Sequence, residues 1–551
     1  MFTRLKRLAA ATALLLAPVA HADGIVDNVN GITLDAHGAV VRFEALQIDP
    51  YGKVVAVYAK GQKRPKKLVW RLDLKGATIV PGMIDAHGHV MDLGFQLLHL
   101  DLAAATSLDD ALARTRAYAA KSRGQWIVGG GWNQESWRLG RFPTAAELDR
   151  AVSDRPVWLD RVDGHAGWAN SKALALAGIT AATKDPAGGR IERDAAGNPT
   201  GVLVDAAADL VIKVIPKSTP RERNAAFLAA QEQLLSLGIT ATADMGTTID
   251  DWETMRAMAD IGQLHLRILS YGRGVETALR VAGAGPTPWL YDDRLRMGGI
   301  KLLADGALGS RGAWLKADYS DAPGNKGLGF YSDDQLLNLM ARGAMDNFQI
   351  AVHAIGDRAN QQVLDAIEIL SETYKGDRRW RIEHAQILDP KDLPRFAKLG
   401  TIASMQPVHQ TSDRLMAEAR LGPDRLAGAY AWRTLLQDGT HLAFGSDYPV
   451  ESPDPWAGWA ASFTRQDASG NPPGGWRPEE KLTREQGWAG FTIGAAYASF
   501  AEDKIGRLAP GLWADFLILD RDPLTASPAE LRGTRVVETW VGGRRAWGKK
   551  P

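Results

Sequence analysis

The stretch Ala77-Thr78-Ile79-Val80-Pro81-Gly82-Met83-Ile84-Asp85-Ala86-His87-Gly88-His89 is the part of the sequence that decides the fold. Its apolar first part predicts a β-strand, and two histidines follow it. On an extended strand, residues i and i+2 point to the same side, so His87 and His89 can bind one metal ion together. A single His-x-His pair is a weak signal, and the prediction depends on whether further ligands follow.

Three further residues of metal-ligating type end predicted strands downstream. His353 follows the apolar run 349–352, His384 follows 380–383, and Asp447 follows 442–446. Imidazole and carboxylate suit Zn²⁺, while Fe, Mn, Co and Ni accept the same ligands. The alternative, ordinary hydrogen-bonded histidines, explains poorly why they recur at the same end of successive strands. We therefore predict a site for one or two divalent ions, with Zn²⁺ the first expectation.

Strand and helix patterns alternate around these residues. In addition to the strand before His87, apolar strands are predicted near 239–244, 266–270, 298–303, 348–353, 380–384, 401–405 and 441–446. Eight strands alternating with helices predict an α/β fold, a TIM-like (β/α)8 barrel formed by residues 81–123 and 221–499. The candidate ligands would then lie at the C-terminal ends of the strands, where barrel enzymes hold their active sites.

The segments outside the barrel are rich in short strands. Residues 23–80 and 500–551 are predicted to form one small β-sandwich built from both chain ends. Residues 124–220 interrupt the barrel pattern and are predicted to be an inserted subdomain over the barrel mouth. Four tryptophans are expected to reach that mouth and to favour an apolar or aromatic substrate, with ordinary packing as the alternative: Trp132, Trp168, Trp314 and Trp456.

The N-terminal residues predict export. Arg4, Lys6 and Arg7 precede an apolar stretch, and Ala20-His21-Ala22 fits a small-x-small cleavage site. Residues 1–22 are therefore expected to be a signal peptide, which leaves a periplasmic or secreted protein with no membrane anchor. The chain has no cysteine, so neither disulfides nor thiolate ligands are available.

The charge balance excludes one class of partner. The 551 residues include 65 Lys and Arg against 64 Asp and Glu, which provides no electrostatic argument for nucleic acid binding. The expected partner is a small-molecule substrate. The oligomeric state stays open, with a homodimer among the options.

Lys301 lies in an otherwise apolar predicted strand. A lysine pointing into a barrel is costly unless it is neutralised or paired. If CO2 adds to its amine, the resulting carbamate is an anion that can bridge two metal ions. The alternative is a buried ion pair with Asp305 or Asp244.

Several segments together resemble the amidohydrolase superfamily of metal-dependent hydrolases, and more closely its N-substituted formamide deformylase-like (YtcJ-type) branch. The matching segments are 81–89, 129–132, 163–168, 304–311, 353–357, 383–386, 404–407, 445–447 and 506–515. The resemblance implies a barrel with a composite β-sandwich, a mono- or dinuclear metal site and hydrolysis of C–N bonds. Lys301 falls where that superfamily often has a bridging carbamate.

The residue types suggest a role for each candidate catalytic residue. Asp447 is the expected general base for a metal-activated water. His165 and His409 are candidate donors to substrate, with structural hydrogen bonding as their alternative; His99, His265 and His441 are expected to be structural.

Two other functions stay open: hydrolysis of a lactone, ester or cyclic imide, or non-enzymatic periplasmic binding on a degenerate barrel. The presence of Asp447 argues against the latter.

Overall fold

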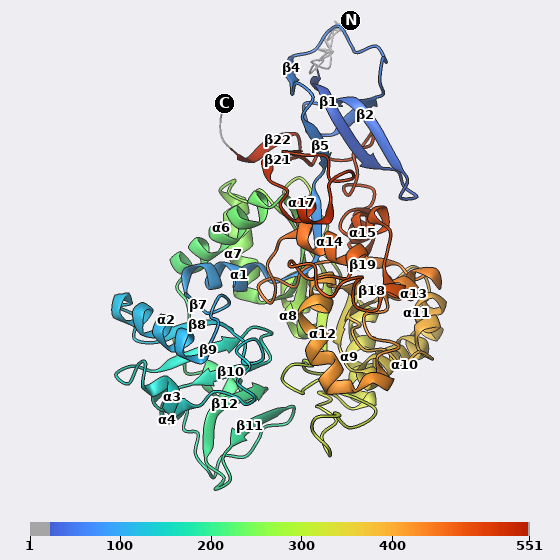
Figure 1. Ribbon diagram of the computed structural model, residues 1–551. Coiled ribbons are helices and arrows are strands. Elements are labelled where there is room, and N and C mark those ends of the chain that lie inside the picture. The colour runs from blue at the N-terminus through green and yellow to red at the C-terminus, as the bar shows by residue number, and fades with distance from the viewer. Residues whose placement is uncertain (1–22, 549–551) are drawn as a thin grey trace, which may run out of the picture.

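The computed structural model describes residues 23–548, and a parallel barrel forms its centre (Figure 1). Eight strands pair in one sheet, each beside the next along the chain: β6 (Met83–Gly88), β13 (Ile239–Thr247), β14 (Arg267–Arg273), β15 (Leu295–Leu303), β16 (Gln349–Ala354), β17 (Arg381–His384), β18 (Ile402–Met405) and β19 (Leu442–Phe444). Just beyond β19, Asp447 N–H donates to His87 O and His89 N–H donates to Tyr448 O, which nearly closes the barrel. The predicted fold class and its eight strands are confirmed.

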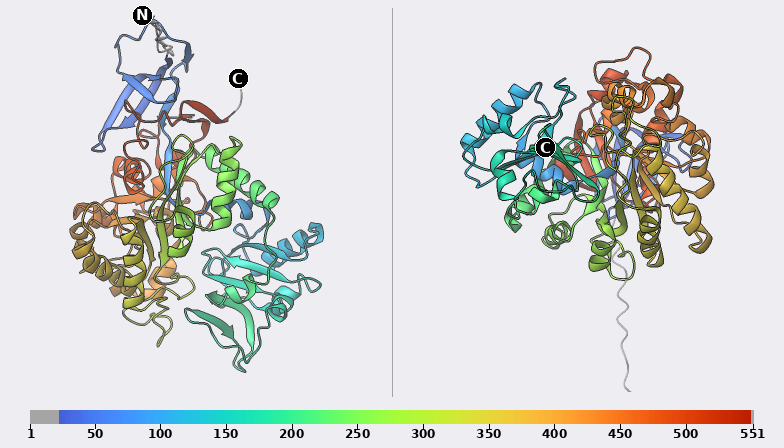
Figure 2. Two further views of the ribbon diagram at one scale, coloured as in Figure 1. Left: turned by 180° about the vertical axis from the view of Figure 1, so that it is seen from behind. Right: turned by 90° about the horizontal axis from the view of Figure 1, so that it is seen from below.

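Helices surround these strands (Figure 2). Their apolar faces, such as Leu336 and Leu364, pack in one core with Ile300, Val352 and Ile382 of the strands. The described helices of the barrel are α1 (Val90–Leu98), α6 (Pro220–Ser236), α7 (Ile249–Asp260), α8 (Gly274–Ala282), α9 (Asp333–Met345), α10 (Asp357–Thr373), α11 (Leu393–Leu399), α12 (Pro407–Leu421), α13 (Trp432–Gln437), α14 (Pro455–Thr464), α15 (Arg484–Gly490) and α16 (Ile493–Ala498). Strands covered in this way lose contact with water on both faces, which explains their nearly continuous apolar sequences.

Gly82 separates two strands that the apolar sequence pattern joined into one. β5 (Thr78–Pro81) pairs in a sheet outside the barrel, whereas β6 belongs to the barrel. A Cβ atom at Gly82 would lie 2.1 Å from Thr240 Oγ1, so only glycine allows this close passage. The chain therefore passes from one sheet into the other within a single residue.

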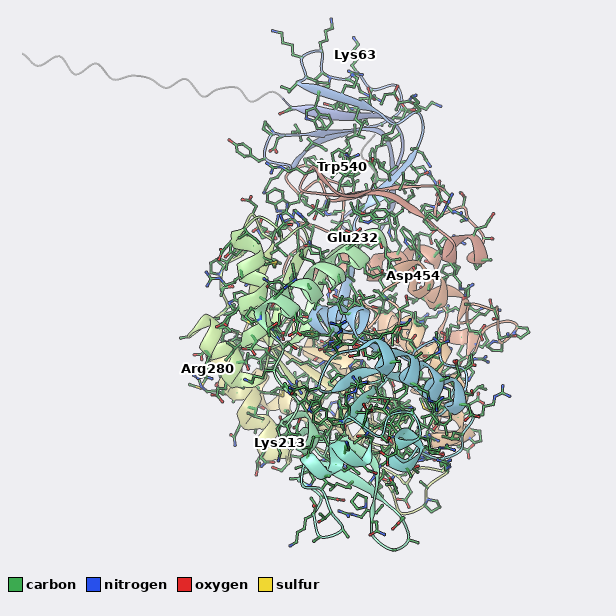
Figure 3. The ribbon with its side chains drawn as sticks, turned by 90° about the vertical axis from the view of Figure 1, so that its left-hand side faces the viewer. Lys63, Lys213, Glu232, Arg280, Asp454 and Trp540 are labelled. Atoms are coloured by element: carbon green, nitrogen blue, oxygen red, sulfur yellow. The ribbon has the colours of Figure 1, made fainter. Side chains whose placement is uncertain are left out.

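The sheet outside the barrel is built from both chain ends. Its strand order is β22-β21-β20-β5-β1-β2-β3, with β4 paired to β1. The further strands are β1 (Gly24–Leu34), β2 (Val40–Ile48), β3 (Val54–Tyr58), β4 (Trp70–Asp73), β20 (Phe516–Leu519), β21 (Val536–Val541) and β22 (Arg544–Gly548). Phe43, Leu46 and Phe516 share its core, and Trp540, labelled in Figure 3, stacks on Phe516. Antiparallel pairing of β5 with β20 joins the N- and C-terminal contributions.

A second, separate sheet lies beside the barrel, between α1 and α6 in the chain (Figure 1). Its strand order is β11-β12-β10-β9-β8-β7. The strands are β7 (Leu100–Asp101), β8 (Ile127–Trp132), β9 (Val157–Arg161), β10 (Ala166–Ala169), β11 (Gly189–Arg193) and β12 (Pro199–Asp205), and the helices are α2 (Leu108–Lys121), α3 (Ala145–Asp149), α4 (Ser171–Leu176) and α5 (Asp209–Ile212). We call residues 100–219 the inserted unit. It begins at β7, upstream of the expected start at residue 124, because α2 packs on this sheet through Leu112 and Ala119.

The tryptophans predicted for the barrel mouth pack elsewhere, with one exception. Trp132 and Trp168 lie in the core of the inserted unit, where their indole N–H groups donate to Leu159 O and Thr144 O. Trp456, on α14, is buried and donates to Leu237 O. For these three the expectation was wrong, because each indole satisfies its single donor inside a core. Only Trp314, whose backbone N–H donates to Asp305, stays near the predicted ligands.

Within residues 23–548, no helix is long and apolar enough to cross a membrane. The predicted signal peptide, residues 1–22, lies outside the described residues.

Candidate metal centre

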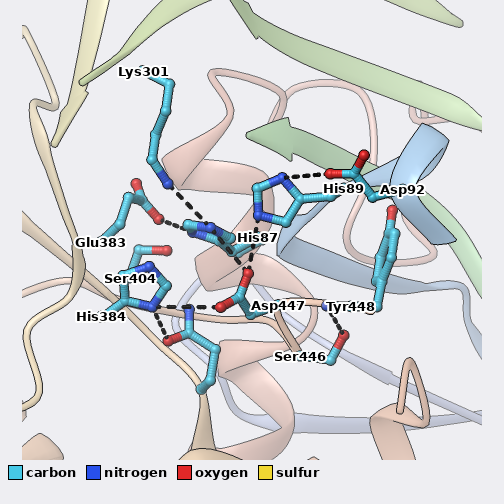
Figure 4. Close-up of polar contacts among 12 residues, drawn as sticks. His87, His89, Asp92, Lys301, Glu383, His384, Ser404, Ser446, Asp447 and Tyr448 are labelled. Carbon is cyan, nitrogen blue, oxygen red and sulfur yellow. Dashed lines mark hydrogen bonds and ion pairs between the residues drawn. The ribbon is translucent and has the colours of Figure 1, made fainter. Parts of the chain in front are cut away.

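Three of the predicted ligands form a compact cluster at the C-terminal ends of the barrel strands. Ligand atoms of His87, His384 and Asp447 all lie within 4.8 Å of one another, and the three side chains are buried. His89 lies beside them, with its Nε2 atom 3.1 Å from Asp447 Oδ1 (Figure 4). The His87 Nε2 atom is 3.4 Å from the same oxygen. Asp447 thus lies between the two histidines of the His-x-His pair.

The remaining two predicted ligands border this cluster. The ring of His353 lies 4.6 Å from that of His384, and the ring of His384 lies 4.6 Å from that of His87. Lys301 Nζ lies 3.2 Å from His87 Nε2. All six residues predicted from sequence to hold metal are therefore neighbours in space.

Lys301 has none of the ion pairs considered from the sequence. Asp305 instead accepts backbone N–H groups of Trp314, Ile355 and Gly356. Asp244 accepts from Val90 N–H and from the Thr247 hydroxyl. Burial lowers the pKa of the Lys301 amine to about 8, because the charged form is poorly solvated there.

Glu383 and Arg381, on β17, orient His87 through the ring nitrogen that does not face the cluster. His87 Nδ1 donates to Glu383 Oε2 at 2.6 Å, so its Nε2 lone pair faces the cluster. Arg381 donates to both Glu383 oxygens, at 2.7 and 3.1 Å. The sequence prediction did not include either residue. Their signal in the sequence was two opposite charges at i and i+2 of a predicted strand; the structure shows that all four residues of that strand are buried, where charges need a partner.

Asp85 joins the two chain segments that carry His87 and Asp447. Its carboxylate accepts from His87 N–H at 3.0 Å and from the Ser446 hydroxyl at 2.6 Å. Burial raises the pKa of Asp85 to about 7. A Cβ atom at Gly445 would lie 2.4 Å from Asp85 Oδ1, so glycine is needed for this approach. These contacts position Asp447 against the end of β6.

Two of the candidate ligands occupy left-handed backbone conformations. His384 has φ of 75° and Asp447 has φ of 62°, and Ala385 follows with φ of 42°. Non-glycine residues rarely adopt this region, and such strain is often found at functional sites. Here it turns both side chains away from the strand direction and into the cluster.

The charge states of the cluster suit a divalent cation. Burial, first of all, lowers the pKa of His87, His353 and His384 well below the usual range, so these imidazoles are neutral, the form that binds metal. Burial alone would raise the pKa of Asp447, but the neighbouring His87 and His89 outweigh it and hold that pKa well below the usual range. Burial alone would lower the pKa of His89, but its hydrogen bond to Asp447 outweighs burial and raises that pKa. The three neutral imidazoles around an ionised carboxylate fit Zn²⁺ and related ions.

The two candidate donor histidines approach the cluster from different units. His165, in the inserted unit, donates from Nδ1 to Asp205 Oδ1 at 2.7 Å, and its ring lies 5.0 Å from that of His353. His409, on α12, has its Nε2 atom 3.8 Å from Asp447 Oδ2. Both predicted residues therefore border the ligands. The three histidines expected to be structural are outside the cluster; His99 stacks on Phe95 and His441 on Tyr497, and the backbone N–H of His265 donates to Gln231.

Comparison with known proteins agrees with this geometry. The amidohydrolase family model matches residues 72–546. The chain belongs to the amidohydrolase family. YtcJ of Bacillus subtilis (strain 168) is 34% identical over 487 residues, which cover 87% of this chain and 90% of YtcJ. The N-substituted formamide deformylase of Arthrobacter pascens is 28% identical over 540 residues, covering 95% of this amidohydrolase and 97% of that enzyme.

A solved structure matches the whole fold. It is an uncharacterized metal-dependent hydrolase from Pyrococcus horikoshii OT3, 29% identical, with a TM-score of 0.75. The match covers 92% of this amidohydrolase and 99% of the archaeal chain. The resemblance seen in the sequence segments is thereby confirmed over nearly the whole described chain.

Proposed function

We propose that this amidohydrolase cleaves an amide-type C–N bond of a small molecule, with one or two divalent ions, first of all Zn²⁺, held by His87, His89, His353, His384 and Asp447. The observation that carries the proposal is the cluster of three neutral imidazoles, His87, His353 and His384, around one ionised carboxylate at the barrel mouth. The similarity to a deformylase of N-substituted formamides supports a small N-acyl amine as substrate.

A divalent ion in this cluster would lower the pKa of a water molecule toward neutrality and polarise the substrate carbonyl. Asp447 is the proton carrier in the proposal. Its carboxylate is ionised and therefore able to take a proton from the attacking water. It then delivers that proton to the nitrogen of the leaving amine, so that the C–N bond breaks to give an acid and an amine.

His165 and His409 are the proposed donors to the carbonyl oxygen as negative charge develops on it. His165 is oriented by Asp205, and both histidines border the ligand cluster. Because His165 belongs to the inserted unit, that unit completes the site rather than merely covering it.

Lys301 is proposed to carry a carbamate. The addition of CO2 to its neutral amine forms an N–C bond and releases one proton, and the product is an anionic ligand. The amine lies 3.2 Å from His87 Nε2, so the added carboxylate would lie within the cluster. A lysine without an acidic hydrogen-bond partner among the described residues is otherwise costly at this depth.

We further propose that the protein is exported, because residues 1–22 have the layout of a signal peptide. N-terminal sequencing of protein from the periplasm or medium should begin at Asp23. Exported protein that begins at Met1 would contradict this.

The decisive experiment compares bond types, with amides and esters matched on one benzyl skeleton. Mature protein, stripped of metal and then loaded with Zn²⁺ or Co²⁺, is assayed on N-formyl and N-acetyl benzylamine, on the corresponding benzyl esters, on a lactone and on a cyclic imide. We expect metal-dependent turnover, fastest on an N-acyl amine. Turnover confined to esters, lactones or imides would exclude the proposed bond, and tight binding without turnover would favour a binding protein.

A further inference from the structure

Gln386 links the ligand-bearing strand β17 to His409 on α12. It follows the two left-handed residues His384 and Ala385, and its side chain is buried. Its amide nitrogen lies 3.1 Å from His409 Nδ1. At its other end, the amide oxygen lies 3.3 Å from the Tyr430 hydroxyl, which donates more closely to Asp413 Oδ2 at 2.8 Å, and the backbone oxygen of Gln386 accepts from Tyr430 N–H at 2.7 Å. Gln386 is therefore held between Tyr430 and His409.

This contact determines which nitrogen of His409 carries the proton. An amide NH2 group can only donate, so His409 Nδ1 must accept. In a neutral imidazole the single ring proton then lies on Nε2. That atom is buried and has no hydrogen-bond partner within residues 23–548. It lies 3.8 Å from Asp447 Oδ2, too far for a hydrogen bond.

A buried N–H group without a partner is costly, and in a site of this kind it points to a group that arrives with the substrate. The ring of His409 stacks over that of His384 at 6.0 Å, so its free N–H lies at the edge of the ligand cluster. An oxygen atom of a substrate carbonyl held at the cluster is the acceptor that fits this donor.

We propose that Gln386 is a positioning residue that holds His409 in its Nε2–H tautomer and so presents a hydrogen-bond donor to the substrate carbonyl oxygen. The catalytic part of this inference rests on the proposed function; the tautomer does not. If the Gln386 amide were reversed, its oxygen would face His409, the proton would move to Nδ1, and Nε2 would present a lone pair that cannot donate.

The tautomer can be measured without any substrate. Mature protein labelled with ¹⁵N-histidine and loaded with diamagnetic Zn²⁺ is examined by two-bond ¹⁵N–¹H correlation, and the His409 signals are identified by their loss in His409→Gln. We expect a protonated Nε2 and an unprotonated Nδ1. A proton on Nδ1, alone or together with one on Nε2, would overturn the proposal, because Gln386 cannot then donate to that atom.

Kinetics test the consequence with a matched pair of variants. Gln386→Met keeps the length of the side chain but removes its donor. Gln410→Met makes the same change at the buried residue next to His409 in the chain. The side-chain nitrogen and oxygen of Gln410 have no hydrogen-bond partner among the described residues, so this variant is the control. For Gln386→Met we expect kcat on the best N-acyl amine to fall about tenfold, with KM within about twofold and metal content unchanged. That is less than the ~10²-fold loss typical when an oxyanion donor is removed altogether.

Gln410→Met should keep wild-type kcat. A folded Gln386→Met variant with wild-type kcat, or equal losses in both variants, would overturn the positioning role. If Gln386→Met does not fold, the wild-type spectrum still decides the tautomer. If no amide is hydrolysed at all, the proposed function fails, and the spectrum judges this inference separately.

Discussion

The barrel mouth and the inserted unit both bury large side chains that carry ring nitrogens, and they use these nitrogens differently. In the inserted unit, the single N–H of Trp132 donates to Leu159 O, so nothing is left for a ligand. At the barrel mouth, His87 donates from Nδ1 to Glu383 and keeps its Nε2 lone pair facing the cluster. Burial of a nitrogen-bearing ring therefore does not by itself indicate a metal site. The indication is a ring nitrogen that can still bind a ligand after the local hydrogen bonds are made.

The largest effect is expected for His87→Ala. Loss of this ligand should remove metal and reduce turnover below detection, since Asp447 and Lys301 also lose the neighbour that both contact. His99→Ala, which removes an imidazole outside the cluster, is the matched control and should keep both properties. Metal analysis and assay of the two purified variants test this, and full metal content in His87→Ala would show that the cluster is not the metal site.

Asp447→Asn should lower kcat by at least ~10², the lower end of general acid–base contributions. The amide keeps the shape of the side chain but cannot accept the proton from water. Steady-state kinetics should be accompanied by circular dichroism and metal analysis of the same preparation. A folded variant that retains metal and wild-type kcat would exclude Asp447 as the base.

The proposed carbamate on Lys301 predicts that activity depends on pH and CO2. Its pKa is lowered to about 8 by burial, so its amine is protonated below pH 8 and neutral above it. Only the neutral amine reacts with CO2, so recovery of activity from metal-free protein with Zn²⁺ and bicarbonate should rise with pH. Below pH 8 its rate should fall about tenfold per pH unit, as the neutral fraction does.

Lys301→Met is the control for this experiment and should show no bicarbonate dependence. Mass spectrometry under non-denaturing conditions should detect the added CO2 in the wild-type protein. Activity that recovers fully without CO2, with an unmodified lysine, would reject the carbamate.

The smallest effect on substrate preference is expected from Trp132→Ala, even though it should destabilise the protein by about 3–5 kcal/mol, as is typical for a buried tryptophan. Because Trp132 packs with Trp168 inside the inserted unit, the ratio of kcat/KM for matched benzyl and methyl N-acyl amines should not change. Thermal unfolding and the two assays measure this. A changed ratio with unchanged Tm would indicate that Trp132 contacts the substrate, as first expected from the sequence.

Much of the architecture was predictable because it depends on local patterns. Apolar runs alternating with helical patterns indicated all eight barrel strands, and a chemically distinctive residue marked the ends of several of them. The boundary of the inserted unit was less predictable, because β7 has only two residues and α2 has an ordinary amphipathic pattern. The predicted domain boundary lay close to Gly82, but the division of the apolar run into two strands was missed, since β5 and β6 are both fully buried and differ in the sheets that they join.

The sequence by itself determined the identity of the six candidate ligands and their placement at strand ends, because parallel strands bring their C-terminal ends to one face. Tertiary structure decided what those residues can do. Glu383 orients His87, Asp85 ties the segments of His87 and Asp447 together, and Gln386 sets the proton of His409. These partners are far apart along the chain or on different elements, and a hydrogen bond depends on distance and direction that no sequence spacing specifies. The same reason explains why tryptophans expected at the mouth were found in cores.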